Sequence, residues 1–144
     1  MKKILCQTFI ASLLVFSATT EIQAATQYWD LNGATPGAGA TPDGFWDTNT
    51  ANWNSLSDGS GPVAVWTNSN NARFAAGADA VNPYTVTVGT ITLGQIGLKE
   101  GAAVTFNGGQ LTFNHAAGGT SILTGVNGIP TTAVINSHIW NGRF

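Results

Sequence analysis

The sequence predicts an all-β fold built from short strands. Gly, Thr and Asn make up 47 of the 120 residues that follow Ala24. This composition disfavours helices, because Gly costs backbone entropy and Thr loses side-chain rotamers. Val, Ile, Leu, Phe and Trp nevertheless return at short intervals, as half-buried strands require. Clusters of Gly, Asn and Pro separate these apolar segments, so we expect many short strands divided by turns.

The first 24 residues have the order of charged and apolar residues that is typical of a secretory signal peptide. Lys2 and Lys3 precede an apolar run over residues 4–16, which is shorter than the roughly 20 residues that a transmembrane helix needs. Small residues at the end of this region predict cleavage after Ala24, with Ala25 as the second choice. We therefore expect an exported protein, secreted, periplasmic or at the cell surface, with no membrane span after signal removal.

Residues 25–75 are predicted to form an irregular, aromatic-rich N-terminal cap. Four of the five tryptophans lie there, among Gly, Pro and Asn clusters that leave room only for short strand-like pieces. From residue 76 to residue 144 the pattern changes to strands with apolar residues at alternate or adjacent positions. These predicted strands cover residues 84–88, 90–93, 95–98, 103–106, 110–113, 120–123, 133–135 and 138–140.

Two architectures accommodate such strands. A β-sandwich connects them by hairpins, whereas a parallel β-helix, or solenoid, stacks them as rungs on successive coils of about 20 residues. The match between Ile91-Thr92-Leu93 and Leu111-Thr112-Phe113, twenty residues apart, favours the β-helix. The strand pattern runs to the last residues without a closing polar cap, so the solenoid is predicted to be incomplete at its C-terminus. The β-sandwich stays the alternative.

Two aromatic motifs resemble the opening of the autotransporter-associated β-strand repeat proteins, a large family of bacterial surface proteins. The first is Tyr28-Trp29-Asp30-Leu31-Asn32-Gly33, and the second runs from Gly44-Phe45-Trp46-Asp47 to Asn52-Trp53-Asn54. Trp66, the stretch 72–77 and Pro83-Tyr84-Thr85-Val86-Thr87-Val88 extend the likeness over most of the chain. The resemblance implies a right-handed parallel β-helix at the cell surface or outer membrane. The repeat units that name the family are missing, so the chain resembles an N-terminal portion truncated before them.

The charge of the chain excludes several classes of partner. Removing Lys2, Lys3 and Glu21 with the signal leaves three basic and six acidic side chains, a net charge of −3. Nucleic acids and anionic membrane surfaces require clustered Lys and Arg, so neither is an expected partner. Cys6 lies within the signal, so the mature chain has no thiol for a disulfide or a metal site.

Catalytic and metal-binding motifs are also missing from the sequence, which predicts a non-enzyme without a cofactor or metal. No serine lies in a nucleophile elbow, and the few carboxylates lie mostly in turns. Asp30 and Asp47 begin segments that are similar to calcium loops but lack the remaining spaced ligands, which favours turn and cap roles. His115 and His138 are far apart and have no third ligand at metal-site spacing.

The tryptophans allow two interpretations. They can plug the open end of a β-helix as a structural cap, or they can stack on sugar rings as exposed platforms. The cap interpretation is favoured because this half of the chain has few aliphatic residues to form a core. It assigns structural roles to Trp29, Asp30, Trp46, Asp47, Trp53 and Trp66. The sugar-binding alternative uses Trp46 and Trp53 as the platform.

The sequence therefore predicts the N-terminal part of a secreted or surface-displayed β-helical protein with a structural or adhesive role. Extracellular polysaccharide or other surface components are the expected partners. One alternative is a small secreted carbohydrate-binding module, and another is a truncated chain without function.

Overall fold

A computed structural model describes residues 24–99, 103–114, 122–123 and 132–141. The predicted signal segment up to residue 23 lies outside these ranges, as do Glu100 and His115. The described residues form ten strands and no helix, so they include no helix capable of crossing a membrane.

The ten strands form two sheets. Sheet A has the order β3-β1-β4-β7-β9, and sheet B has the order β10-β8-β5-β2 with β6 also beside β8. The strands of sheet A are β1 (Thr26–Trp29), β3 (Trp53–Asn54), β4 (Asn71–Phe74), β7 (Ile96–Leu98) and β9 (Ile122–Leu123). Those of sheet B are β2 (Gly44–Trp46), β5 (Tyr84–Val88), β6 (Thr90–Leu93), β8 (Val104–Phe113) and β10 (Ala133–Asn141).

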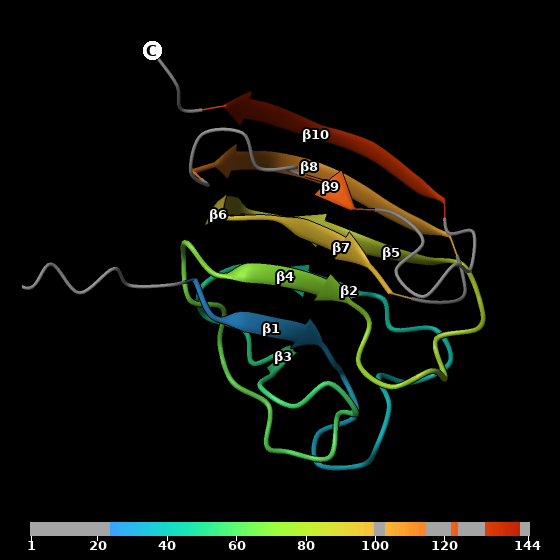
Figure 1. The fold of residues 1–144 in the computed structure, drawn as a ribbon. Coiled ribbons are helices and arrows are strands. Elements are labelled where there is room, and N and C mark those ends of the chain that lie inside the picture. Colours follow the sequence, from blue (N-terminus) through green and yellow to red (C-terminus); the bar gives the residue numbers. More distant parts are fainter. Residues whose placement is uncertain (1–23, 100–102, 115–121, 124–131, 142–144) are drawn as a thin grey trace, which may run out of the picture.

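The two sheets lie one behind the other, with β1 toward one end of the molecule and β10 at the other (Figure 1). Neighbouring strands run parallel, except that β3 is antiparallel to β1. Successive side chains of a strand point to opposite faces, so the alternating apolar residues of both sheets meet in one core. Phe74 of sheet A and Phe106 of sheet B, for example, have ring centroids 4.9 Å apart.

The strand β8 is the longest element of sheet B and pairs with two shorter strands in succession. Its first half lies beside β5, with Tyr84 opposite Val104, and its second half lies beside β6, with Ile91 opposite Leu111. Gly108 and Gly109 join the two halves with φ angles of 74° and 50°. This left-handed backbone region is open to Gly and costly for other residues, so the glycine pair lets β8 continue through an irregular point.

The predicted fold class, a short-stranded right-handed parallel β-helix start behind an irregular cap, is wrong. The strands form one mixed and one parallel sheet, β8 and β10 span ten and nine residues, and β3 runs antiparallel to β1. The alternative, a β-sandwich of hairpin-connected strands, does not describe these ladders either. Among the described strands, only the β1–β3 pair is antiparallel.

The segment predicted as an irregular cap contains four short strands within otherwise irregular chain. The segment 25–75 supplies β1, β3 and β4 to sheet A and β2 to sheet B. Its tryptophans carry large apolar surfaces, and burying them requires both sheets to close around them. Turn-forming residues in this segment shorten its strands without preventing them.

Candidate functional site

The predicted cap tryptophans form the centre of the core. Trp29, Trp46, Trp53 and Trp66 are between 0% and 2% exposed. Trp53 is the hub, since its ring centroid lies 5.2 Å from that of Trp29, 5.1 Å from Trp46 and 4.6 Å from Trp66. Trp46 and Trp53 therefore present no ring face to a sugar in this structure. Their surroundings support a packing role.

The four buried indole N–H groups differ in their partners. Trp29 Nε1 donates to the carbonyl of Pro42 at 2.8 Å, and Trp66 Nε1 donates to Asn68 Oδ1 at 3.2 Å. The Nε1 atoms of Trp46 and Trp53 are buried without a hydrogen-bond partner. An unpaired buried donor costs stability. Trp46 and Trp53 therefore stabilise the fold by ring packing, but their unpaired N–H groups offset part of this gain.

Asp30 follows β1 directly and is completely buried. Its Oδ2 accepts a hydrogen bond from Asn54 Nδ2 at 2.8 Å, and its Oδ1 accepts one from the backbone N–H of Asn32 at 3.0 Å. When the side-chain amide of Asn32 is oriented with its nitrogen toward the acceptors around it, this nitrogen also donates to Asp30 Oδ1 at 2.7 Å. Burial raises the pKa of Asp30 despite these hydrogen bonds, which act in the opposite direction.

Asn54 extends the Asp30 network into the next loop. Its Nδ2 also donates to the carbonyls of Gly59 and Gly61 at 3.2 and 2.6 Å, and its Oδ1 accepts from the backbone N–H of Leu56 at 2.9 Å. The carboxylate and the amide thus tie β1 to the loop after β3. Both carboxylate oxygens of Asp30 accept hydrogen bonds, Oδ1 from the backbone N–H of Asn32 and Oδ2 from the side-chain amide of Asn54, which is a structural arrangement.

Asp47, the second predicted cap carboxylate, closes an exposed turn after β2. Its Oδ1 accepts from the backbone N–H groups of Asn49 and Thr50 at 2.8 and 2.6 Å, and its Oδ2 accepts from the Thr50 hydroxyl at 3.1 Å. These hydrogen bonds, that of Thr50 first, lower the pKa of Asp47. Because side-chain oxygens favour such local amides, Asp47 acts as a turn residue.

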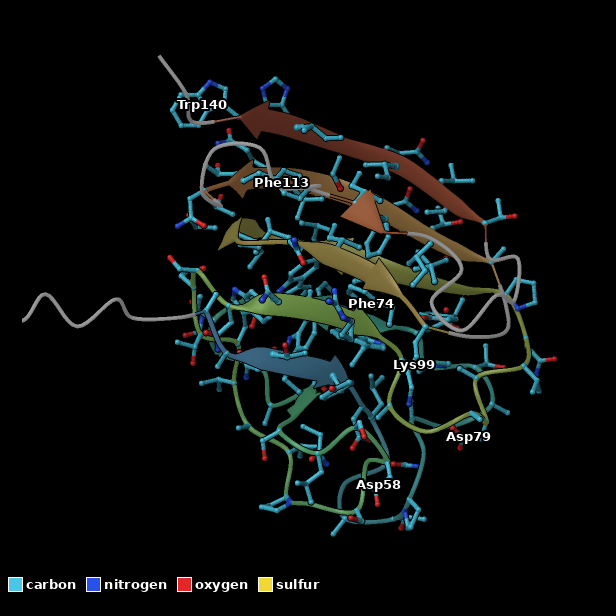
Figure 2. All side chains as sticks on the ribbon, in the orientation of Figure 1. Asp58, Phe74, Asp79, Lys99, Phe113 and Trp140 are labelled. Atoms are coloured by element: carbon cyan, nitrogen blue, oxygen red, sulfur yellow. The ribbon has the colours of Figure 1, made fainter. Side chains whose placement is uncertain are left out.

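A further set of charged side chains holds the loops at the end of the molecule beyond β1. Asp79 accepts from the backbone N–H groups of Ala38 and Gly39 at 2.7 and 3.0 Å. Lys99 Nζ donates to the carbonyls of Ser57 and Gly77 at 3.0 and 3.2 Å. Figure 2 shows Lys99, Asp79 and Asp58 among these loops, far from Trp140. These contacts join separate loops, so they too are structural.

One surface open to a ligand is the outward face of sheet B, which we call the outer face of sheet B. It consists of the strand residues whose side chains alternate with the buried ones. These are Phe45 of β2, Thr85, Thr87, Thr90 and Thr92 of β5 and β6, Thr105, Asn107, Gln110 and Thr112 of β8, and Val134, Asn136, His138 and Trp140 of β10. All are exposed or half-buried.

The strand registers arrange this face in rows across the sheet. Phe45, Thr87, Asn107 and Asn136 form one row, and Thr92, Thr112 and Trp140 form another. Adjacent strands lie about 4.8 Å apart, so neighbouring side chains in a row are in contact range. Asn136 Nδ2 donates to Asn107 Oδ1 at 2.8 Å, and Gln110 Nε2 donates to Thr112 Oγ1 at 3.1 Å.

Sequence reasoning did not single out this face. The signal for it was the recurrence of Thr at alternate positions, as in Thr85 and Thr87 or Thr90 and Thr92. Alternation shows which side chains share a face of a strand, whereas the position of the second sheet decides which face is outward. The sequence places Phe45 within the second aromatic motif and Trp140 within the predicted strand at residues 138–140, yet these side chains are 61% and 43% exposed.

Metal-ligating side chains do not gather in the part of the chain that the structure describes. No group of three or more His, Asp or Glu residues there is close enough to hold an ion. His138 lies on β10, on the outer face of sheet B, and is exposed. Comparison with protein-family models, curated proteins and solved structures found no match for this chain.

Proposed function

We propose that this chain is part of an exported, non-catalytic protein that attaches bacterial surfaces to extracellular material. The observation that carries the proposal is the outer face of sheet B, a broad uncharged surface spread over five parallel strands. A closely packed aromatic core supports this face and leaves it rigid, which suits repeated contacts with an extended partner.

The remaining conspicuous side chains support the same function. Asp30, Asp47, Asp79 and Lys99 hold loops in place through hydrogen bonds to the backbone. The buried tryptophans fill the space between the sheets. A protein of this kind acts by presenting a surface, and the signal segment over residues 1–24 supports export as the route to that role.

Export and attachment can be tested on the full chain with a C-terminal tag in a bacterial host. We expect N-terminal sequencing of the exported protein to begin at Ala25, or at Thr26 if cleavage follows Ala25. Beads coated with the exported protein should be retained on a film of bacterial extracellular matrix.

Beads coated with the same protein after unfolding in urea provide the control, because they carry the same composition without the sheet. Retention of the unfolded coating at the same level would show non-specific adsorption and contradict the attachment function. An unprocessed chain that stays in the cytoplasm would contradict export.

A further inference from the structure

The outer face of sheet B has no formally charged residue. None of its thirteen residues is Asp, Glu, Lys or Arg. Charged partners gain affinity by pairing with opposite charges, and nothing here offers such a pair. A neutral ligand suits this face because it carries no charge that would lose its hydration without gaining an ionic partner.

The face is nevertheless rich in hydrogen-bonding groups. Each Thr hydroxyl supplies one donor and two acceptor lone pairs, and each Asn or Gln amide supplies both kinds of group. The hydroxyls of Thr87, Thr90 and Thr105 make no hydrogen bond to any other described residue. A partner with many hydroxyl groups of its own can therefore bond to several rows of the face at once.

Two exposed aromatic rings lie on strands at opposite edges of sheet B. Phe45 on β2 is 61% exposed, and Trp140 on β10 is 43% exposed. Three strand spacings and about four residues of strand length separate them, which corresponds to a diagonal of roughly 20 Å. Aromatic faces stack on apolar C–H surfaces, and Trp combines such a face with a polar N–H. The diagonal is long enough for several units of a polymer.

We propose that the outer face of sheet B binds a neutral polysaccharide chain. The chain crosses the strands between Phe45 and Trp140, stacks sugar rings on these two side chains, and bonds through its hydroxyl groups to the intervening Thr, Asn and Gln residues. This inference rests on the proposed attachment function and names its ligand class. It moves carbohydrate recognition away from Trp46 and Trp53, which are buried in the core.

The test uses the full exported protein and measures its mobility in native gels that contain a neutral polysaccharide, hydroxyethyl cellulose or dextran. Pull-down on insoluble cellulose and chitin covers the neutral polymers that do not dissolve. We expect retardation or capture by at least one of these four probes, and none by the anionic polysaccharide alginate. Raising the salt from about 0.05 to about 0.5 M should leave the affinity unchanged, because ionic screening weakens only charge pairs.

Substitutions on and off the face locate the site. Phe45→Ala and Trp140→Ala should each weaken binding about tenfold, the loss expected for one aromatic stacking contact. Leu56→Ala is the matched control, since Leu56 is 48% exposed but lies outside the face. Thr87→Val and Thr105→Val keep the shape of the side chain and remove the hydroxyl, so they should weaken binding while the unfolding midpoint stays near that of the wild type.

Several results would overturn the inference. One is an absence of binding to all four neutral probes, and another is an unchanged affinity in both Phe45→Ala and Trp140→Ala. Matrix retention that survives glycosidase treatment but is lost after protease treatment of the matrix would assign the face to a protein partner instead. If matrix retention persists while every neutral probe fails, the ligand class is wrong and attachment stands. If both fail, the proposed function itself is wrong.

Discussion

The indole N–H groups allow single residues of the core to be compared. Trp29 and Trp46 are both completely buried, but only Trp29 has a partner for its Nε1, the Pro42 carbonyl. Replacing Trp29 by Phe removes ring volume and also leaves that carbonyl without its donor. Replacing Trp46 by Phe removes similar volume together with a donor that was never satisfied.

We therefore expect Trp29→Phe to lower the free energy of unfolding by about 1–2 kcal/mol more than Trp46→Phe does. Urea unfolding followed by far-UV circular dichroism measures both variants. An equal loss in the two variants, or a larger loss in Trp46→Phe, would contradict this assignment of the hydrogen bonds.

The two predicted cap carboxylates give opposite pH dependences. Asp47 has a pKa below the ordinary value of 3.8, so its ionised form is favoured by folding. Its contribution to stability is fully present above pH 3.8 and is lost as the pH falls through the lowered pKa. Asp30 has a raised pKa, so its contribution is present below 3.8 and is lost as the pH rises through that raised pKa.

Asp47→Asn tests this sign at Asp47, because the amide keeps one oxygen for the turn and removes the charge. We expect the variant to have a lower melting temperature than the wild type at pH 6 and nearly the same one at pH 2. Asp30 is present in both proteins, so its opposite effect cancels in the difference. A gap that grows toward low pH would show that the pKa of Asp47 is not lowered.

At the scale of the element, the glycine pair in β8 decides whether one long strand can form. Both glycines have positive φ, but a Cβ on Gly109 would overlap the carbonyls of Val88 and Gly89, whereas one on Gly108 would meet only the Val88 oxygen at 3.8 Å. Gly108→Ala therefore measures the backbone strain alone. Gly109→Ala adds a steric clash with the neighbouring strand segment.

We expect Gly109→Ala to reduce the free energy of unfolding by at least about 1 kcal/mol more than Gly108→Ala does, since strained backbone positions cost of order 1–3 kcal/mol. Chemical unfolding of the two variants measures the difference. Equal stabilities would mean that β5 and β6 shift easily to make room.

The same glycine pair shows how far the strands were predictable. Apolar alternation correctly placed strands at residues 84–88 and 90–93. Gly108 and Gly109 had the composition of a turn, so residues 103–106 and 110–113 were predicted as two strands. In the structure residues 104–113 form the single strand β8, because glycine within a strand can mark a local irregularity as well as the end of the strand. Local composition does not distinguish these uses.

The N-terminal strands and the candidate site escaped prediction for a related reason. β3 has only two residues and is defined by its pairing with β1, a partner that lies far away in the sequence. A tryptophan in the sequence can be exposed or buried. For Trp46 and Trp53, the positions of the two sheets determine that both rings are buried. The outer face of sheet B likewise depends on the registers between strands.

For the whole molecule, the ring contacts that cross between the sheets predict a single unfolding transition. Phe74 of sheet A lies 5.4 Å from Trp46 and 4.9 Å from Phe106, both in sheet B. Removing its ring opens a cavity at the point where the sheets meet. We expect Phe74→Ala to cost about 3–5 kcal/mol, the usual range for a buried aromatic residue.

Cooperativity is checked by following that variant and the wild type with two probes, far-UV circular dichroism for the strands and near-UV circular dichroism for the aromatic core. Coincident midpoints are expected for each protein. Two separate transitions in the wild type would show that the sheets fold independently and that the core does not join them.

The division of the tryptophans into four buried rings and the partly exposed Trp140 has an optical consequence. A water-soluble collisional quencher such as iodide reaches only indoles at the surface, so Trp140 should account for the quenchable part of the emission. The shielded remainder should emit at shorter wavelengths until the core opens. Since Trp140 lies on the outer face of sheet B, a bound polymer would protect it from iodide. The loss of iodide quenching would then measure polymer binding without an added label.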